Sequence, residues 1–248
     1  MWIGLCAGGS YIYTCTVMLM PINWGTFLLI SSATTALYSF LKLLKKPSSQ
    51  AGIILTVSSL AAITSLLYSG IDTDCLILIP AGVLGIGYGY IPLNKGNLRS
   101  IPFIKVFIIA AVWVWVTTVF PIYKNFEIFN WHHIVLVCSQ LFYLVGVTVL
   151  FDIRDLKYDS SVLKTIPQTM GIKSTKSLSI ILIVLSSVLM LGSIYNTDSS
   201  MFMVPILLST VVSLAVTFIC SENRSHHYYT VLADGVLLFQ GIIVLAFL

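Results

Sequence analysis

Hydrophobic residues recur along this chain in long stretches, separated by short segments that carry the turn-forming and charged residues. There are nine such stretches, over residues 2–20, 23–43, 51–69, 75–91, 104–120, 131–150, 177–195, 201–220 and 229–248. A helix of about 20 apolar residues crosses the hydrocarbon core of a bilayer. Backbone groups in hydrocarbon must be paired within the segment, and the alternating pattern of a membrane barrel is missing, so we expect helices.

Composition agrees with this pattern, because 58% of the residues are hydrophobic and only 9% are charged. Such values are typical of multi-pass membrane proteins and exclude an ordinary soluble domain. No segment between the stretches resembles a soluble domain, so residues 1–248 are expected to form one transmembrane domain. The predicted fold class is all-α. The five cysteines form no CxxC pair and are interpreted as packing residues.

Positive charge is distributed very unevenly between the two sets of loops. Twelve of the thirteen lysines and arginines fall after the second, fourth, sixth and eighth stretches, and only Lys124 falls on the opposite face. Basic loops stay in the cytoplasm, so the N-terminus is predicted to be cytoplasmic and the C-terminus outside. The formal charge of +4 is thereby explained mostly by topology, and no nucleic-acid partner is expected.

The run DIRDLKYD, at residues 152–159, concentrates three of the nine acidic residues directly after an apolar stretch. On a helix, Asp152, Asp155 and Asp159 fall within an arc of about 60°, so their carboxylates face one point. Converging carboxylates repel one another unless a cation lies between them, and Mg²⁺ shared with a phosphate is a natural candidate. The run therefore predicts a diphosphate site. The alternative is a solvated turn beside the membrane.

This run resembles the second aspartate motif, DxxDxxxD, of the UbiA superfamily of intramembrane prenyltransferases. Two further segments match in order. Residues 88–121 resemble the aromatic span, basic loop and lysine that precede the motif in that family, and TIPQTMGIKSTK, at 165–176, resembles the signature that follows it. The resemblance covers essentially the whole chain. It implies nine helices bundled around a central cavity that opens to the cytoplasmic face.

The resemblance also implies an activity and a set of site residues. Such proteins bind an isoprenyl diphosphate with its tail among the helices, and an acceptor attacks the allylic carbon as diphosphate leaves. Asp152, Asp155 and Asp159 are assigned to Mg²⁺. The basic residues assigned to the diphosphate are Lys95, Arg99, Lys105 and Arg154. Each of these four has an alternative role as a positive-inside anchor.

The chain departs from the family in its N-terminal part. The family carries a first acidic motif at the cytoplasmic end of the second span, whereas no Asp or Glu precedes Asp72 here, and the matching stretch is Tyr38–Lys42. We hypothesise that Lys42, with Lys45, binds phosphate directly and replaces one Mg²⁺ bridge. The alternative is that Lys42 serves only as a topology anchor.

Four further residues are expected to line the substrate pocket: Ser39, Tyr88, Tyr90 and Asp234. A charged group inside a span usually marks function or an internal pair, and Asp234 lies about six residues into the last stretch. Tyr88 and Tyr90 are placed to line the isoprenoid mouth or to stack on an allylic cation, but aromatic residues at the membrane interface are an equal alternative.

The leading prediction is thus a Mg²⁺-assisted membrane prenyltransferase. Its expected partners are a polyprenyl diphosphate, a lipophilic acceptor of the aromatic or glycerol-phosphate type, and membrane lipid, with no protein partner. The missing first motif favours an alternative, a non-catalytic relative that binds a polyprenyl lipid or stabilises a membrane complex. A transporter is a third possibility, although the ionisable groups gather at one face and do not line a path through the membrane.

Overall fold

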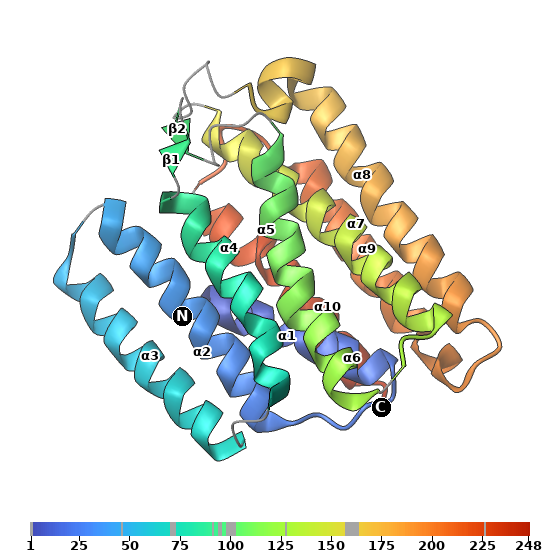
Figure 1. Ribbon diagram of the computed structural model, residues 1–248. Coiled ribbons are helices and arrows are strands. Elements are labelled where there is room, and N and C mark those ends of the chain that lie inside the picture. The colour runs from blue at the N-terminus through green and yellow to red at the C-terminus, as the bar shows by residue number, and fades with distance from the viewer. Residues whose placement is uncertain are drawn as a thin grey trace.

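A computed structural model of the chain describes residues 2–45, 47–69, 73–90, 92–93, 96–97, 103–126, 128–156, 164–225 and 227–248. Ten α-helices make up most of it (Figure 1). They are α1 (Trp2–Val17), α2 (Trp24–Lys45), α3 (Ser49–Ser69), α4 (Ile79–Tyr90), α5 (Ile104–Val114), α6 (Phe120–Asn125), α7 (Trp131–Asp155), α8 (Ile166–Ile194), α9 (Met203–Ile219) and α10 (Gly235–Leu245). The predicted all-α class is confirmed.

Shorter elements join these helices. The 3₁₀ helices η1 (Thr73–Leu78) and η5 (Asp198–Phe202) precede α4 and α9. The π-helical segment η3 (Trp115–Val119) joins α5 to α6, and the π-helical segment η6 (Tyr228–Ala233) leads into α10. Two-residue strands, β1 (Pro92–Leu93) and β2 (Gly96–Asn97), pair in antiparallel fashion in the α4–α5 connection. Single π-helical turns are rare and occur frequently at functional sites.

Seven helical stretches in the described part of the chain are long and apolar enough to cross a membrane. They are Trp24–Leu44, Ser49–Tyr68, Ile104–Asn125, Trp131–Asp155, Ile166–Ile194, Asp198–Ile219 and Tyr228–Leu245. The other two predicted stretches form shorter apolar helices, α1 with 16 residues and the segment Cys75–Gly87. The chain is therefore a multi-pass membrane protein in which two of the predicted spans are short.

The α8 helix begins eleven residues before the predicted span because local hydrogen bonds start it there. The backbone N–H of Thr165 donates to Gln168 Oε1 at 3.0 Å, which is half of a capping box, and Pro167 fits the first helical turn. The connection between the predicted stretches 131–150 and 177–195 is consequently shorter than the sequence indicates, because α7 also extends into it as far as Asp155.

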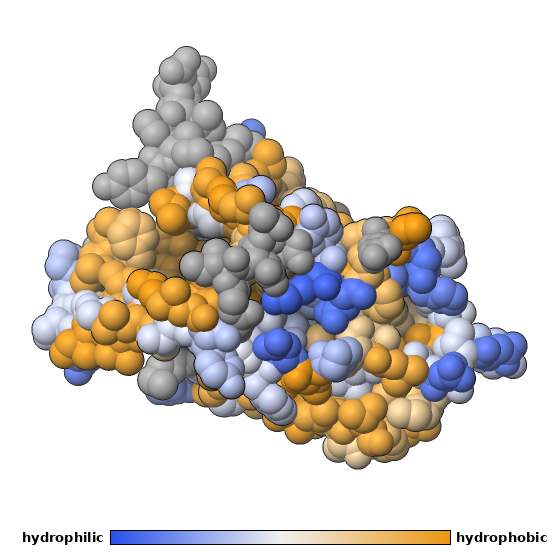
Figure 2. Space-filling model, turned by 60° about the horizontal axis from the view of Figure 1, so that its bottom comes forward, coloured by the Kyte–Doolittle hydropathy of each residue, from blue (hydrophilic) through white to orange (hydrophobic). Residues whose placement is uncertain are grey.

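The helices alternate in direction, so that the C-terminal ends of α4 and α7 and the N-terminal ends of α5 and α8 lie at one end of the bundle (Figure 1). We call this the motif end, because it carries Asp152 and Lys105. The α2–α3 hairpin forms one edge of the bundle, and α8 lies at the opposite edge. Apolar side chains cover much of the outer surface, as a face in contact with lipid requires (Figure 2).

Contacts inside the bundle combine apolar packing with hydroxyl groups that bond across helices. Tyr143 and Ser213 hydroxyls lie 2.6 Å apart, and Ser179 donates to the carbonyl of Gly146 at 2.7 Å. Such bonds and small residues replace the hydrophobic driving force that helices lack in lipid. The most completely buried helix is α1, which packs between α2 and α10.

Glycines bring α1 and α10 into backbone contact. A Cβ added at Gly241 would lie 2.1 Å from the carbonyl oxygen of Gly9, closer than any real Cβ contact, and one added at Gly9 would lie 2.5 Å from the Cα of Leu238. No side chain fits at either glycine, so this crossing depends on both. By contrast, an added Cβ at Gly192 in α8 meets no atom within 4 Å.

We expect opposite effects when these two kinds of glycine are replaced by alanine. Gly241→Ala should lower the free energy of unfolding by about 1–3 kcal/mol, because the helices must separate. Gly192→Ala should raise it by up to about 1 kcal/mol, because alanine favours the helix. Thermal unfolding of the detergent-solubilised protein measures both. Equal stability of the two variants would contradict the close α1–α10 crossing.

Candidate functional site

The last turn of α7 places two of the three motif aspartates side by side at the motif end. Asp152 is almost completely buried, with 3% of its side chain exposed, and Asp155 is 18% exposed. Carboxylates are disfavoured at a helix C-terminus, where the helix dipole is negative. Their position therefore needs positive partners from neighbouring elements.

Lys105, in the first turn of α5, supplies one of these partners. Its Nζ lies 2.7 Å from Asp152 Oδ1 and 3.6 Å from Asp155 Oδ2, so a single ammonium group contacts both carboxylates. A lysine at a helix N-terminus is also at the disfavoured end of the dipole. The α5 and α7 ends therefore compensate each other, and the carboxylates of Asp152 and Asp155 converge on one lysine.

Arg154 supplies the second partner. Its Nε lies 2.7 Å from Asp155 Oδ1 and its Nη2 lies 3.2 Å from Oδ2, a two-point contact with one carboxylate. The guanidinium group lies over the rings of Phe151 and Tyr229, at 5.1 and 5.9 Å from the ring centres. Because Tyr229 belongs to η6, this stacking links the motif to the start of the last span.

Asp234 follows η6 and directly precedes α10, and its backbone N–H donates to the carbonyl oxygen of Tyr229 at 3.1 Å. The Arg154 guanidinium lies over the ring of the same tyrosine, so Asp234 belongs to the segment that packs beside the motif. Among the described residues, no ion pair within 4.0 Å is found for Asp234. An acidic side chain inside a span is costly and usually marks function or an internal pair. Residues from α5, α7 and η6 thus meet at the motif end.

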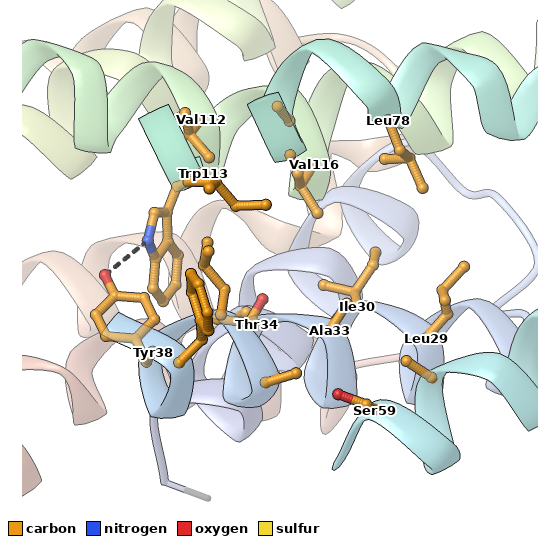
Figure 3. A pocket seen from close by; sticks show the side chains of 18 of the residues that line it. Leu29, Ile30, Ala33, Thr34, Tyr38, Ser59, Leu78, Val112, Trp113 and Val116 are labelled. Atoms are coloured by element: carbon orange, nitrogen blue, oxygen red, sulfur yellow. Dashed lines mark hydrogen bonds between the residues drawn. The ribbon is translucent and has the colours of Figure 1, made fainter. Parts of the chain in front are cut away.

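An apolar cavity of about 470 Å³ lies within the bundle. Its walls come from α2, α3, η1, α4, α5 and η3, with one residue from α1. Figure 3 shows Tyr38 and Trp113 at one end, where the indole Nε1 donates to the Tyr38 hydroxyl at 3.4 Å. None of the described residues that line it is charged. Tyr38 and Trp113 therefore bring polar groups to one end of a hydrocarbon-like space.

The other expected site residues fall into two groups. Lys42 is exposed on α2, one helical turn beyond Tyr38 and on the same face, and Ser39 is half-buried beside Tyr38. Tyr88 and Tyr90 lie in the last turn of α4, with side chains outside the described part of the structure. Asp159, Lys95 and Arg99 lie outside the described residues, as does the side chain of Lys45.

Several cavity residues were not identified from the sequence. Trp113 is one of them, and Val116 and Thr117 in η3 are others. The aromatic run WVWV in residues 113–116 was a visible signal, but apolar residues in a span look alike whether they face lipid or a cavity. The π-helical turn that carries two of these residues toward the cavity has no sequence signature of its own.

The residues at the motif end fit the Mg²⁺ that the family resemblance implies. Mg²⁺ is usually held by one or two carboxylates together with phosphate oxygens, and Asp152 and Asp155 already converge on a cation. In the described part of the chain, no three His, Cys, Asp or Glu residues form a metal-binding group. The third motif aspartate, Asp159, is outside that part.

Two solved structures resemble this chain over nearly its whole length. No protein-family model and no curated protein matches the chain. A UbiA homologue from Aeropyrum pernix K1, solved in the apo state, superposes with a TM-score of 0.66 at 14% identity, over 98% of this chain and 97% of that chain. A UbiA homologue from Archaeoglobus fulgidus, bound to GPP and Mg²⁺, superposes with a TM-score of 0.57 at 13% identity, over 99% and 96%. The chain therefore has the UbiA fold.

Proposed function

We propose that this protein is a UbiA-like prenyltransferase that moves an isoprenyl group from a polyprenyl diphosphate to a lipophilic acceptor. One observation carries the proposal. Two carboxylates and two cations converge at the start of α5 and the end of α7, and about two helical turns further along α5 Trp113 lines an apolar cavity, an arrangement that suits a molecule with a diphosphate head and a hydrocarbon tail. A solved structure with the same fold is bound to GPP and Mg²⁺, which supports the assignment of donor and metal.

The diphosphate head is assigned to the motif end. Asp152 and Asp155, with Asp159, would hold Mg²⁺. When bound there, the metal ion would neutralise negative charge on the leaving diphosphate. Lys105 and Arg154 already contact these carboxylates. Phosphate oxygens bound beside the carboxylates would therefore be close enough to accept hydrogen bonds from both basic side chains. Lys42, Lys95 and Arg99 are proposed as further phosphate contacts. Fixed positive charge in a site poor in water favours departure of the diphosphate.

The isoprenyl tail is assigned to the apolar cavity. The bond between the allylic carbon and the diphosphate oxygen breaks, the acceptor forms a new bond to that carbon, and the acceptor loses a proton. The apolar walls keep water away from the carbocation-like centre. The rings of Tyr38 and Trp113 stand at one end of the cavity and are suited to stabilise positive charge.

The acceptor is proposed to be an aromatic or glycerol-phosphate-type molecule. Ser39, Tyr88, Tyr90 and Asp234 are proposed to line its side of the pocket. Asp234 is the best supported of these, since its backbone bonds to Tyr229, whose ring lies under the Arg154 guanidinium.

A specific observation favours the second candidate, a non-catalytic polyprenyl-lipid-binding protein. No acidic residue precedes Asp72, so the first metal motif of the family is missing. In addition, the point where Asp152 and Asp155 converge is held by Lys105. A single metal, or none, still permits binding of a diphosphate through lysine and arginine.

Release of diphosphate separates these two functions. Purified protein given GPP should release diphosphate when Mg²⁺ is present and stop when EDTA is added. Asp155→Asn should slow release by about 100-fold, because one carboxylate for the metal is lost. Asp198→Asn, which changes an exposed aspartate in η5, is the matched control and should match the wild type. If GPP binds but no diphosphate is released, the non-catalytic function is correct; if GPP does not bind, both proposals fail.

Lys42 is tested by affinity for the donor. Lys42→Ala should weaken GPP binding by about tenfold, since a charge-assisted hydrogen bond to phosphate is lost. Lys173→Ala removes the same charge from an exposed position in α8 and should leave the affinity unchanged. Isothermal titration in detergent with Mg²⁺ measures both variants. Equal affinities for the two would assign Lys42 to membrane topology only.

A further inference from the structure

A second, smaller cavity lies at the end of the bundle opposite the motif end, and its volume is about 200 Å³. Its walls come from α1, from the connection between α1 and α2, from the first turn of α2 and from α6. Figure 1 shows the start of α2 and the end of α6 at this end of the bundle. A cavity holds a water molecule once about 10–15 Å³ is open to it, so this one has room for a group of several heavy atoms.

Hydrogen bonds fix the polar part of this cavity. Asn23 Oδ1 accepts from the backbone N–H of Thr26 at 3.0 Å, which caps the start of α2. The Tyr11 hydroxyl donates to the carbonyl of Asn23 at 3.2 Å, and the backbone N–H of Asn23 donates to the same hydroxyl at 3.0 Å. On the α6 wall, Asn125 Nδ2 donates to the carbonyl of Pro121 at 2.8 Å. Both walls are therefore held in place by bonds within the chain.

Lys124 lines the cavity from the last turn of α6. In the described part of the chain, four basic side chains are half-buried, and three of them have polar partners. Lys105 and Arg154 contact the motif aspartates, and Lys176 donates to two backbone carbonyls at the end of α9, at 2.6 and 2.9 Å. For Lys124, neither a hydrogen bond nor an ion pair is found among the described residues. A partly desolvated ammonium group without a partner favours an anion from outside the chain.

The start of α2 adds partial positive charge to the cavity wall. The N–H groups of Trp24 and Gly25 are among the first four of this helix, which have no partner within it, and the helix dipole is positive at this end. None of the described residues that line the cavity is acidic. An ammonium group, an amide and backbone N–H groups together suit a compact anion with several acceptor oxygens, as a phosphate is.

Exposed aromatic side chains place this cavity at the depth of lipid headgroups. Trp24 and Tyr123, which are next to Asn23 and Lys124 in the sequence, are 59% and 45% exposed. Trp131, at the start of α7, is 69% exposed. Exposed tryptophan and tyrosine gather where a membrane meets water. A phospholipid has its phosphate at this depth and its acyl chains in the hydrocarbon beside it, so a lipid is favoured over a free anion.

We propose that this cavity binds the phosphate group of a phospholipid. Lys124 is the counter-ion of the phosphate, and Asn23, whose Oδ1 is used in the cap of α2, donates to it through Nδ2. The site lies at the end of the bundle opposite the motif end, so it is separate from the proposed transfer of an isoprenyl group. A bound headgroup would join the end of α6 to the start of α2, two segments that are far apart in the sequence.

Two variants change the cavity and leave the helices intact. Lys124→Met removes the charge and keeps an unbranched side chain. Asn23→Asp places a negative charge beside the phosphate and preserves the start of α2, because Asp caps a helix as well as Asn does. Lys173→Met, at an exposed position in α8, makes the same change as the first variant and is the matched control.

The probe is phosphatidylglycerol with a diazirine on its glycerol headgroup, added to the purified protein in dodecyl maltoside, a detergent without phosphate. After photolysis, mass spectrometry counts the label at residues 21–26 and 121–125 and elsewhere. Wild type and Lys173→Met should carry equal label at the cavity. Lys124→Met and Asn23→Asp should carry about tenfold less there, as one charge-assisted hydrogen bond is worth, and should match the wild type elsewhere, which shows that they are folded.

Competition identifies the source of the phosphate. Unlabelled phosphatidylglycerol should remove the label from the cavity, and dioleoylglycerol, which has no phosphate, should not. Displacement by micromolar glycerol 1-phosphate would replace the proposed lipid by a soluble phosphate. Displacement by dioleoylglycerol, absence of label at the cavity, or equal label in wild type and Lys124→Met would overturn the proposal and leave Lys124 as a cap for the end of α6.

Discussion

The contact of Lys105 with Asp152 and Asp155 is the interaction on which the site depends. It joins the start of α5 to the end of α7, and each of the groups lies at the end of a helix whose dipole disfavours its charge. In a protein surrounded by lipid, such positions are costly unless the opposite charges meet. Here the opposite charges do meet, so each group offsets the cost of the other, and the proposed phosphate and metal would find both signs of charge already in place.

Two features of the bundle position the elements that lie around this contact. The glycine crossing of α1 and α10 holds the last helix close to the first, and η6, which leads into α10, places the Tyr229 ring under the Arg154 guanidinium. The π-helical turn η3 turns Val116 and Thr117 toward the cavity on the other side. One π-helical segment thus borders the charged group, and the other borders the apolar space. This division matches the two halves of an isoprenyl diphosphate.

Much of this arrangement could be predicted from the sequence, because its signals are strong and local. The apolar stretches gave the helices, and the helical spacing of Asp152 and Asp155 placed both carboxylates on one face, as found. The pairing of these aspartates with Lys105, 47 residues earlier, is a tertiary contact that spacing cannot reveal. The short α1 helix was also hidden, since its sequence remains apolar beyond Val17, where the helix ends. Likewise, no local pattern distinguishes the Trp113 side chain at the cavity from one in lipid.

A structure determined with Mn²⁺ in place of Mg²⁺, and with GPP bound, tests the central claim most directly, because Mn²⁺ is located by its anomalous scattering. We predict a Mn²⁺ peak between the carboxylates of Asp152 and Asp155, with Lys105 Nζ moved onto a diphosphate oxygen and the geranyl chain in the cavity beyond Tyr38. A Mn²⁺ peak elsewhere, with Lys105 still bound to both aspartates, would contradict the account.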